Sequence, residues 1–377
     1  MTEAPVVSIP TDPAQPQLDP TPALCLSGGG FRAMLFHLGA LWRLYETDML
    51  GGIRRISSVS GGSITAGLLG LKWSRLSFRS ANLQNDFVPE IVAPLRGLAG
   101  STTDVKSVLL GFLLPWRTSV HVARAYDKQL FKGATLQDLP DTPLFVINAT
   151  NMQSGVLWRF MKPYMRDWRV GKVPAPTVKL AEAVAASSAF PPVLSPLELR
   201  LNSSDFEPGS GADLQQPPFT TNVILCDGGV YDNLGLETAW KRHRIIFVSD
   251  AGAKFAPEKK PWGNWASQAF RVLNLIDSQV RALRTRQVID SLANGTRSGA
   301  YWGIRTDIGN YGLNDALNCP LARTRELAEI PTRLKRLDDE TQERLINWGY
   351  AVCDAALRAH VNPALAKPAF PYPARGV

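Results

Sequence analysis

The chain has 377 residues, of which 45% are hydrophobic and 20% charged, a composition typical of a globular protein rather than a disordered one. Its 41 Lys and Arg residues outnumber its 33 Asp and Glu residues, so the formal net charge is +8. No run of about 18 apolar residues occurs, so the sequence predicts no membrane-spanning helix. The nearest candidate, VLLGFLLPW at 108–116, is too short.

The two ends of the chain are rich in proline. Residues 1–22 contain no basic segment followed by an apolar one, so we expect a disordered leader rather than a signal peptide. Residues 361–377, VNPALAKPAFPYPARGV, are predicted to form a flexible tail. Between them, residues 23–360 are expected to form one folded domain.

The cysteines show no CxxC motif and no spacing typical of a zinc site. Two of them lie in apolar, strand-like runs, where a free thiol packs as a small hydrophobic group. We therefore expect free thiols, a reducing cytoplasmic setting and no metal site. The four residues are Cys25, Cys226, Cys319 and Cys353.

Short apolar runs typical of β-strands alternate with helical patterns along the chain. Apolar residues spaced by threes and fours predict a helix over 32–50, and a second helix is expected over 63–73. This alternation predicts the α/β class, a three-layer α/β/α sandwich with a mostly parallel central sheet. The predicted strands are residues 23–26, 53–59, 143–150, 222–227 and 244–252.

Residues 80–142 lose this alternation and are predicted to form a helical insertion. The apolar run at 108–116 lies inside it and is followed by basic side chains. Such a segment could be a lid or a membrane-contacting cap, or an ordinary packed insertion, and the sequence does not separate these alternatives. The basic side chains are Arg117, His121, Arg124 and Lys128.

The net positive charge is concentrated late in the chain. Residues 241–305 contain twelve Lys or Arg against four Asp or Glu, which equals the whole excess. A long helix is predicted within them, over 265–292, and residues 201–221 are expected to form an exposed loop. A basic region of this kind could meet an anionic membrane, bind nucleic acid or only keep the protein soluble. Because no nucleic-acid-binding motif accompanies it, we expect no nucleic-acid partner.

Ser60 lies at a predicted strand-to-helix corner, in the sequence Ser58-Val59-Ser60-Gly61-Gly62. This is the context in which G-x-S-x-G forms a nucleophile elbow, with small residues on both sides of the serine. Ser58 replaces the first glycine, a small change unless that position needs a positive φ. Taken alone, the motif also fits an ordinary turn.

A second strand-to-helix corner carries three consecutive glycines, in CLSGGGFRAM at 25–34. The backbone N–H groups of Gly28, Gly29 and Gly30 can converge there on a phosphate, a carboxylate or the oxyanion of an acyl-transfer intermediate. The loop lacks both the P-loop lysine and the dinucleotide-binding spacing, which disfavours a nucleotide site.

Asp227 ends a predicted strand in LCDGGVYDN and is a candidate general base. In a parallel sheet it would lie on the same edge as Ser60, because the carboxyl ends of the strands face the ligand crevice. An Asx-turn that satisfies its own backbone is the alternative, and Asp250 in VSDAG is a rival base. His37 is expected to be structural, and a Ser60, Asp227, His243 triad stays open, without a loop that would present the imidazole.

Four segments in this order resemble the patatin-like phospholipase family. They are SGGGFR at 27–32, the Ser60 elbow, ASSAFPP at 186–192 and DGG at 227–229, and the resemblance covers roughly residues 23–250. It implies that Ser60 is the nucleophile and Asp227 its partner in a dyad without histidine. It also implies that Gly28, Gly29 and Gly30 form the oxyanion hole and that Arg32 orients this loop or meets a head group. The DGG match favours Asp227 over Asp250.

The segment SGGGFRAM also resembles the cytosolic phospholipase A2 branch of this fold. The calcium-binding C2 domain of that branch would not fit into residues 1–22, so we expect a calcium-independent enzyme without metal or cofactor. The predicted function is a lipid acyl hydrolase of phospholipase A type that makes peripheral contact with an anionic membrane. An esterase for simpler esters, or a non-catalytic anion- or membrane-binding protein on the same fold, is the alternative.

Overall fold

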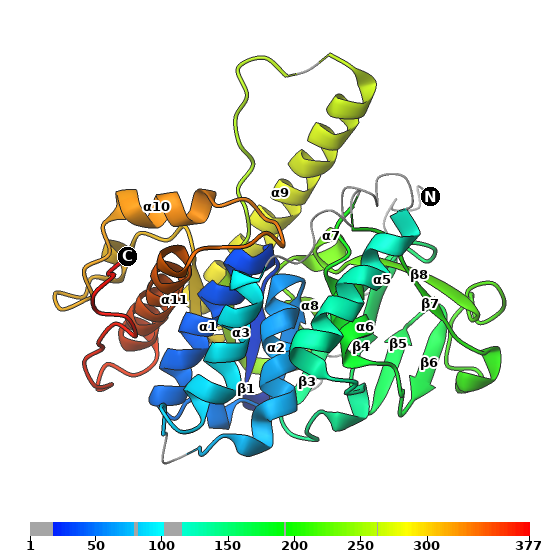
Figure 1. Cartoon of the computed structure of the whole chain (residues 1–377), viewed down its shortest axis with the longest axis horizontal. Coiled ribbons are helices and arrows are strands. Elements are labelled where there is room, and N and C mark those ends of the chain that lie inside the picture. The colour runs from blue at the N-terminus through cyan, green and yellow to red at the C-terminus, as the bar shows by residue number, and fades with distance from the viewer. Residues whose placement is uncertain (1–17, 79–81, 102–114, 192–193, 262) are drawn as a thin grey trace, which may run out of the picture.

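A single ten-stranded sheet joins the strands of the described chain (Figure 1). The computed structural model describes residues 18–78, 82–101, 115–191, 194–261 and 263–377. The main path of the sheet has the order β10-β9-β1-β2-β3-β4-β5-β6, and β8 pairs with β3 and β7 beside it. The strands are β1 (Asp19–Leu26), β2 (Arg55–Val59), β3 (Leu144–Asn151), β4 (Val156–Phe160), β5 (Tyr164–Asp167), β6 (Gly171–Pro174), β7 (Leu197–Arg200), β8 (Asn222–Asp227), β9 (His243–Asp250) and β10 (Ser298–Gly303).

The helices connect these strands and cover the sheet. The α/β class is confirmed, as are the helices expected over 32–50, 63–73 and 265–292, with boundaries shifted by a few residues at most. The described α-helices are α1 (Gly30–Glu46), α2 (Gly61–Lys72), α3 (Ala93–Gly100), α5 (Pro115–Tyr126), α6 (Leu180–Ser187), α7 (Gly229–Asp232), α8 (Glu237–Trp240), α9 (Trp265–Ala293), α10 (Leu321–Glu329) and α11 (Asp339–His360).

Alternate side chains of β1 point to two different layers, as the period of two in a strand requires. Leu24 and Leu26 belong to the large hydrophobic cluster that contains side chains of α1, α2 and α11. Ala23 and Cys25 belong to a smaller cluster with side chains of α8 and α9. The sheet is therefore buried on both faces, which gives the three layers.

The sheet is parallel where it carries the glycine loop and the elbow, and antiparallel beyond. β10, β9, β1, β2 and β3 pair in parallel. β4, β5 and β6 continue in antiparallel pairs, and β8 runs antiparallel to β3. The short strands β4 to β7 and the strand β10 were not predicted from the sequence.

The helices α1 and α11 cross at unusually short distance, because a glycine lies on each side of the crossing. A Cβ on Gly39 would come within 2.0 Å of the Ile346 carbonyl oxygen, and one on Gly349 within 1.9 Å of the Phe36 carbonyl oxygen. Below the crossing, the buried Arg43 pairs with Asp354 at 2.7 Å. The C-terminal helix is therefore part of the same core as the elbow.

Residues 361–377, which we expected to form a flexible tail, pack against the body of the protein in the structure. The Asn347 side-chain amide donates hydrogen bonds to the backbone oxygens of Tyr372, at 2.8 Å, and Gly376, at 2.7 Å. Arg96 lies over the Tyr372 ring at 4.9 Å. Proline here favours an extended chain that packs on the body by backbone and aromatic contacts.

The expected leader and insertion are only partly described. Residues 1–17 lie outside the described ranges, whereas residues 19–22 belong to β1 and not to a leader. Most of the apolar run at 108–116 also lies outside them. The described part of the insertion buries Phe87, Leu95 and Tyr126 in the main core. It is packed like any other helical segment there, and the lid or membrane cap stays a prediction.

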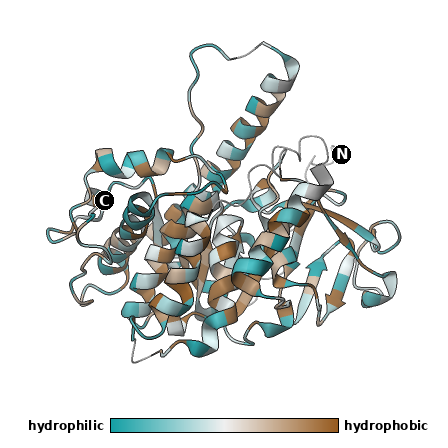
Figure 2. Ribbon diagram, in the orientation of Figure 1, coloured by the Kyte–Doolittle hydropathy of each residue, from teal (hydrophilic) through white to brown (hydrophobic). Residues whose placement is uncertain are grey.

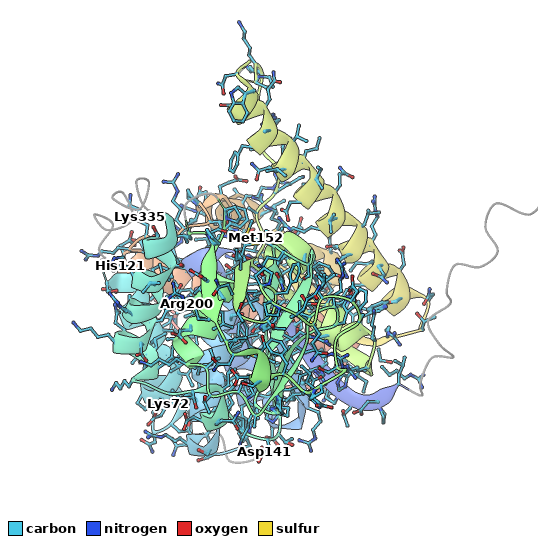
Figure 3. The ribbon with its side chains drawn as sticks, turned by 90° about the vertical axis from the view of Figure 1, so that its right-hand side faces the viewer. Lys72, His121, Asp141, Met152, Arg200 and Lys335 are labelled. Atoms are coloured by element: carbon cyan, nitrogen blue, oxygen red, sulfur yellow. The ribbon has the colours of Figure 1, made fainter. Side chains whose placement is uncertain are left out.

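The helix α9 extends away from the rest of the chain (Figure 1, yellow-green). Its C-terminal half contacts the sheet layer, where Val288 is buried, while its N-terminal half projects beyond the body. Figure 3 shows the same projection from the side. None of the helices in the described ranges combines the length and apolar content needed to cross a bilayer.

Candidate active site

Ser60 occupies a strained turn between β2 and α2. Its φ of 52° and ψ of −120° lie outside the regions that a serine ordinarily adopts. Strain of this kind at a strand-to-helix corner is the mark of a nucleophile elbow. The Ser60 side chain is almost buried, at 7% exposure.

The glycines after Ser60 allow the elbow to pack directly on the glycine loop. A Cβ on Gly61 would come within 2.1 Å of the Gly30 carbonyl oxygen, and one on Gly62 within 2.5 Å of the Leu26 carbonyl oxygen. A Cβ on Gly28 would lie 3.2 Å from the Ser60 Cβ. The two glycine-containing corners predicted separately from the sequence are therefore in contact.

A network of hydrogen bonds among buried hydroxyl groups holds the backbone of the elbow. Ser187 Oγ accepts a hydrogen bond from the Ser60 backbone N–H at 2.9 Å and lies 2.9 Å from Ser63 Oγ. Ser63 Oγ in turn donates to Ser58 Oγ at 3.0 Å. Ser58 lies in β2 and is not among the residues with positive φ. A serine therefore fits where the usual motif has glycine, and its hydroxyl joins this network.

Asp227 lies at the end of β8, beside the elbow, but not for the reason that the sequence indicated. β8 is antiparallel to β3, with Asp227 opposite Ala149, while β2 is parallel to β3, with Val59 opposite Asn148. β4 occupies the other edge of β3 at these positions, so β2 and β8 share one edge and end head to head. Ser60 and Asp227 meet where the two strands stop.

Burial dominates the electrostatics of Asp227, which is 2% exposed. Desolvation raises the pKa of its carboxyl group to about 7, and the charge of Asp277 adds to this effect. Hydrogen bonds from the Gly229 backbone N–H, at 2.7 Å, and from the Ser60 side chain act in the opposite direction on the pKa. A carboxyl group with this pKa can both accept and return a proton near neutral pH.

The three glycine N–H groups are not equivalent. The Gly28 N–H donates to the Asn233 carbonyl oxygen at 3.0 Å. The Gly29 and Gly30 N–H groups make no hydrogen bond to any residue in the described part of the chain. Both residues have positive φ, at 147° and 63°, and they lie at the N-terminus of α1. These two groups are free to meet a negatively charged oxygen.

Arg32 is buried next to the glycine loop and donates hydrogen bonds to backbone oxygens around it. It is 2% exposed, and its guanidinium donates to the carbonyl oxygens of Ile330, at 2.5 Å, and Ala251, at 2.8 Å. It also donates to Ala328 and Thr332. Burial, with the nearby charges of other arginines, lowers the pKa of Arg32 to about 10. Of the two roles expected for Arg32, this geometry fits the orienting one.

His243 and His37 do not complete a triad with Ser60 and Asp227. His243 begins β9 and lies 3.2 Å from Arg55 Nε, at the amino end of β2, whereas Ser60 follows the carboxyl end of that strand. Four residues of strand separate these two ends by about 13 Å. His37 is buried between Ser249 Oγ and the Ser27 carbonyl oxygen, and desolvation lowers its pKa to about 4.

Asp250 ends β9 and is held by neighbours of its own. Its carboxylate accepts from the Gly252 N–H at 2.8 Å and from the Tyr301 hydroxyl at 2.9 Å. No interaction with Ser60 involves it among the described residues. The geometry thus places Asp227, and not Asp250, against the elbow.

Two residues of the site carried no clear signal in the sequence. Ser187 stands in the sequence only as one serine of the ASSAFPP segment, although its hydroxyl accepts a hydrogen bond from the Ser60 backbone N–H. Asn233 lies between the glycine loop and the DGG turn, since a Cβ on Gly28 or Gly229 would come within 2.4 Å or 2.6 Å of its side-chain oxygen. Only contacts between segments distant in the sequence reveal these roles.

Comparison with solved structures places this arrangement in a known fold. Human GIVD cytosolic phospholipase A2 superposes with a TM-score of 0.52 at 13% identity, over 90% of this chain and 61% of that one. VipD from Legionella pneumophila gives a TM-score of 0.41 at 15% identity, over 91% and 67% of the two chains. The chain therefore spans about three fifths of the length of the human structure.

Sequence comparison adds the family. No curated protein matches the chain. The family described as patatin-like phospholipase matches residues 24–240, more than half of the chain, and the match includes the glycine loop, the Ser60 elbow and the DGG turn. The chain belongs to the patatin-like phospholipase family.

Proposed function

We propose that the chain is a lipid acyl hydrolase of phospholipase A type, which cleaves carboxylic esters of phospholipids through an acyl-Ser60 intermediate. Family membership supports lipid hydrolysis. The observation that carries the finer proposal is the contact between a strained serine and a buried carboxyl group with a pKa of about 7. Such a pair can supply a nucleophile and its base without histidine.

In the first half of the reaction, Ser60 Oγ attacks the ester carbonyl carbon while its proton passes to the Asp227 carboxylate. The C–O bond to the alcohol then breaks, and the proton on Asp227 passes to the departing alkoxide. This step releases the lysolipid and leaves an acyl-serine. In the second half, water attacks the acyl carbon and loses a proton to Asp227. The bond to Ser60 Oγ then breaks, and Ser60 recovers that proton from Asp227.

The Gly29 and Gly30 N–H groups are the oxyanion donors that we propose. Both lack a partner among the described residues and lie at the positive end of the α1 helix dipole. Because they point at charge that develops only in the transition state, each could contribute about 3–4 kcal/mol to lowering the barrier. Arg32 then acts as a positioning residue, through its hydrogen bonds to the backbone around the loop.

The proposed reaction needs neither calcium nor a cofactor, since the dyad supplies both nucleophile and base. In the described part of the chain, no three His, Cys, Asp or Glu side chains gather as a metal site would require. The test is activity in the presence of a chelator, which we expect to have no effect.

Contact with an anionic membrane is supported by α9. Its N-terminal half projects from the body with bands of hydrophobic residues (Figure 2). Trp265, Leu273 and Leu283 are 82%, 64% and 58% exposed. Together with Ile276 they recur at a spacing that puts them along one side of a helix. A helix with such a stripe and nearby basic residues is typical of interfacial binding.

The experiment measures fatty acid release from phospholipid vesicles by the wild type, Ser60→Ala and Asp227→Asn, with and without a chelator. Both variants should lose activity while retaining the wild-type circular dichroism spectrum. His243→Gln is the matched control, expected to keep the wild-type rate. Loss of activity in Asp250→Asn but not in Asp227→Asn would assign the base to Asp250. Vesicle binding without hydrolysis by the wild type would favour the non-catalytic alternative.

A further inference from the structure

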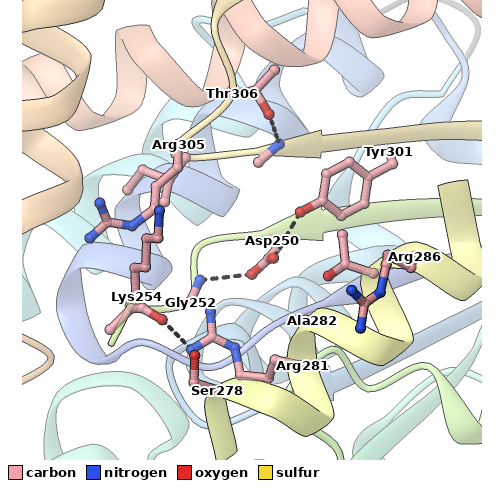
Figure 4. A pocket seen from close by; sticks show the side chains of 14 residues that line it. Asp250, Gly252, Lys254, Ser278, Arg281, Ala282, Arg286, Tyr301, Arg305 and Thr306 are labelled. Carbon is pink, nitrogen blue, oxygen red and sulfur yellow. Dashed lines mark hydrogen bonds between the residues drawn. The ribbon is translucent and has the colours of Figure 1, made fainter. Parts of the chain in front are cut away.

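A cationic pocket lies between α9, the loop after β9 and the end of β10 (Figure 4). Its volume is about 420 Å³, within the roughly 300–1,000 Å³ of small-molecule sites. Arg32 is 2% exposed, and both of its terminal nitrogens donate to oxygens of the protein, so we look for more accessible cations to meet an anionic group of a ligand. This pocket offers them.

Four basic side chains line the pocket against one carboxylate. Asp250 is the single acidic residue of the lining, and both of its oxygens accept hydrogen bonds, from Gly252 and Tyr301. The lining therefore carries more positive than negative charge, even though Asp277 and Glu329 outside it pair with two of the arginines, and Figure 4 shows the basic side chains arranged around the pocket. They are Lys254, Arg281, Arg286 and Arg305.

Several of these cations have donors without a partner. Lys254 and Arg286 are exposed, and neither has a carboxylate within ion-pair distance in the described ranges. Arg281 donates to the Ala253 carbonyl oxygen and pairs with Asp277 at 3.7 Å, and Arg305 pairs with Glu329 at 2.8 Å. The Nε atoms of Arg281 and Arg305 are nevertheless buried without a hydrogen-bond partner. Unsatisfied buried donors of this kind are costly, so an anionic oxygen would be stabilised there.

The pocket opens on the same edge of the sheet as Ser60. Ser58 in β2, Leu26 in β1 and Ser249 in β9 lie in one row across the sheet. Ser60 comes two residues after Ser58 along the chain, and Asp250 comes one residue after Ser249. Two strand spacings thus separate them, about 10 Å along the edge. A glycerophospholipid has its phosphate only a few covalent bonds from its ester carbonyls, so a molecule at Ser60 can reach toward the pocket.

We propose that this pocket binds the phosphate of an anionic lipid head group, with a phosphomonoester such as that of phosphatidic acid as the preferred form. Arginine binds phosphate oxygens through paired N–H groups. A dianionic phosphate complements the excess of positive charge better than a zwitterionic head group does. The proposal names the substrate class for the site described above and rests on the proposed function.

The first test measures binding without turnover, on the Ser60→Ala variant. Titration calorimetry should detect glycerol 3-phosphate and, more weakly, inorganic phosphate. Lys254→Ala/Arg286→Ala, added to this variant, should weaken glycerol 3-phosphate binding at least tenfold. The matched control is Arg54→Ala/Arg244→Ala, which removes two exposed cations from the amino edge of the sheet. It should leave binding unchanged.

The second test compares phosphatidic acid with diacylglycerol of the same acyl chains in mixed micelles. The wild type should cleave the phosphate-bearing lipid with at least tenfold higher kcat/KM. The ratio should fall at least tenfold in Lys254→Ala/Arg286→Ala and stay at the wild-type value in Arg54→Ala/Arg244→Ala. The control separates the pocket from the general attraction of a basic protein to an anionic micelle.

The two proposals fail in distinguishable ways. Absence of glycerol 3-phosphate binding to Ser60→Ala, or equal binding after Lys254→Ala/Arg286→Ala, overturns the phosphate pocket while the dyad stands. Binding of inorganic phosphate as tight as that of glycerol 3-phosphate, together with equal cleavage of both lipids, overturns its assignment to the head group. Glycerol 3-phosphate binding by a wild type that hydrolyses no ester would remove the dyad proposal and leave an anion site.

Discussion

Ser60 and Asp227 lie together because two strands that run in opposite directions stop head to head on one edge of β3. Val59 is paired with Asn148, and Asp227 with the next residue, Ala149. The end of β2 releases the chain into the Ser60 elbow, and the end of β8 releases it into the Gly228-Gly229 turn. A Cβ on Gly228 would come within 2.3 Å of the Asn148 carbonyl oxygen. The glycine therefore lets the two strand ends approach.

The pH dependence of hydrolysis should report Asp227. Its pKa of about 7 means that the carboxylate needed to accept the serine proton disappears on acidification. We expect kcat/KM for a soluble short-chain ester to fall below pH 7, to roughly a hundredth of its plateau at pH 5. A rate that stays constant down to pH 5 would contradict the assignment. His37 cannot produce the same profile, because its pKa lies near 4 and it does not contact the dyad.

Asp227→Asn should make the protein inactive and more stable at alkaline pH. The carboxyl pKa rises from 3.8 to about 7 on folding, so the folded state binds the proton more tightly. The contribution of Asp227 to the free energy of unfolding therefore falls as the pH rises from about 4 to about 7 and stays low above. Asparagine never ionises. The melting temperature of the Asp227→Asn variant should therefore exceed that of the wild type by a few degrees at pH 8, and by less at pH 5. Thermal unfolding at the two pH values measures the difference.

Arg32→Ala should lower kcat much more than it changes KM. The guanidinium fixes the backbone around Ala251 and Ile330, which support the glycine loop. Displacement of one oxyanion donor typically costs about 100- to 1,000-fold in kcat. Arg32→Lys should rescue little, since an ammonium group cannot make the forked set of hydrogen bonds. A variant that raises KM for anionic lipids at unchanged kcat would instead place Arg32 at the head group.

Ser187→Ala and Ser58→Gly form a pair that tests the hydroxyl network. Ser187→Ala leaves the Ser60 N–H without its acceptor, and we expect a drop in kcat of about tenfold or more, because an unsatisfied buried N–H costs about 1–3 kcal/mol. Ser58→Gly restores the usual glycine of the elbow and should keep kcat near the wild-type value. It should lower stability by about 0.5–1 kcal/mol, as glycine does in a strand. Equal loss of kcat in both variants would contradict the separate roles.

The exposed stripe on α9 should govern membrane binding and not the chemistry. Leu273→Ser/Ile276→Ser should reduce flotation with anionic vesicles several-fold and leave hydrolysis of a soluble ester unchanged. Trp168→Ser is the matched control, because Trp168 is also exposed, at 52%, but follows β5 at the far end of the sheet. If the wild type sediments as a dimer that Leu273→Ser/Ile276→Ser dissociates, the stripe is an interface between two copies of the chain instead.

The sequence by itself determined the local chemistry of this protein. Glycine is favoured at a corner with positive φ or a close backbone approach. The two glycine-containing corners, one of them the Ser60 elbow, could therefore be predicted from residue type and spacing alone. Helical periodicity located α1, α2 and α9 to within a few residues, because an apolar stripe is a property of one segment. The family resemblance rested on the same local motifs.

Tertiary structure decided which of these segments meet, and how. No local pattern says that β8 runs antiparallel and ends against β2, because strand direction is set by pairing with β3. The order of the tail at Tyr372 depends on Asn347, and the state of the Asp227 carboxyl group depends on burial by several distant segments. The cationic pocket likewise joins α9 to the ends of β9 and β10. Such contacts arise only when the whole core is assembled, since desolvation and close packing are properties of the folded chain.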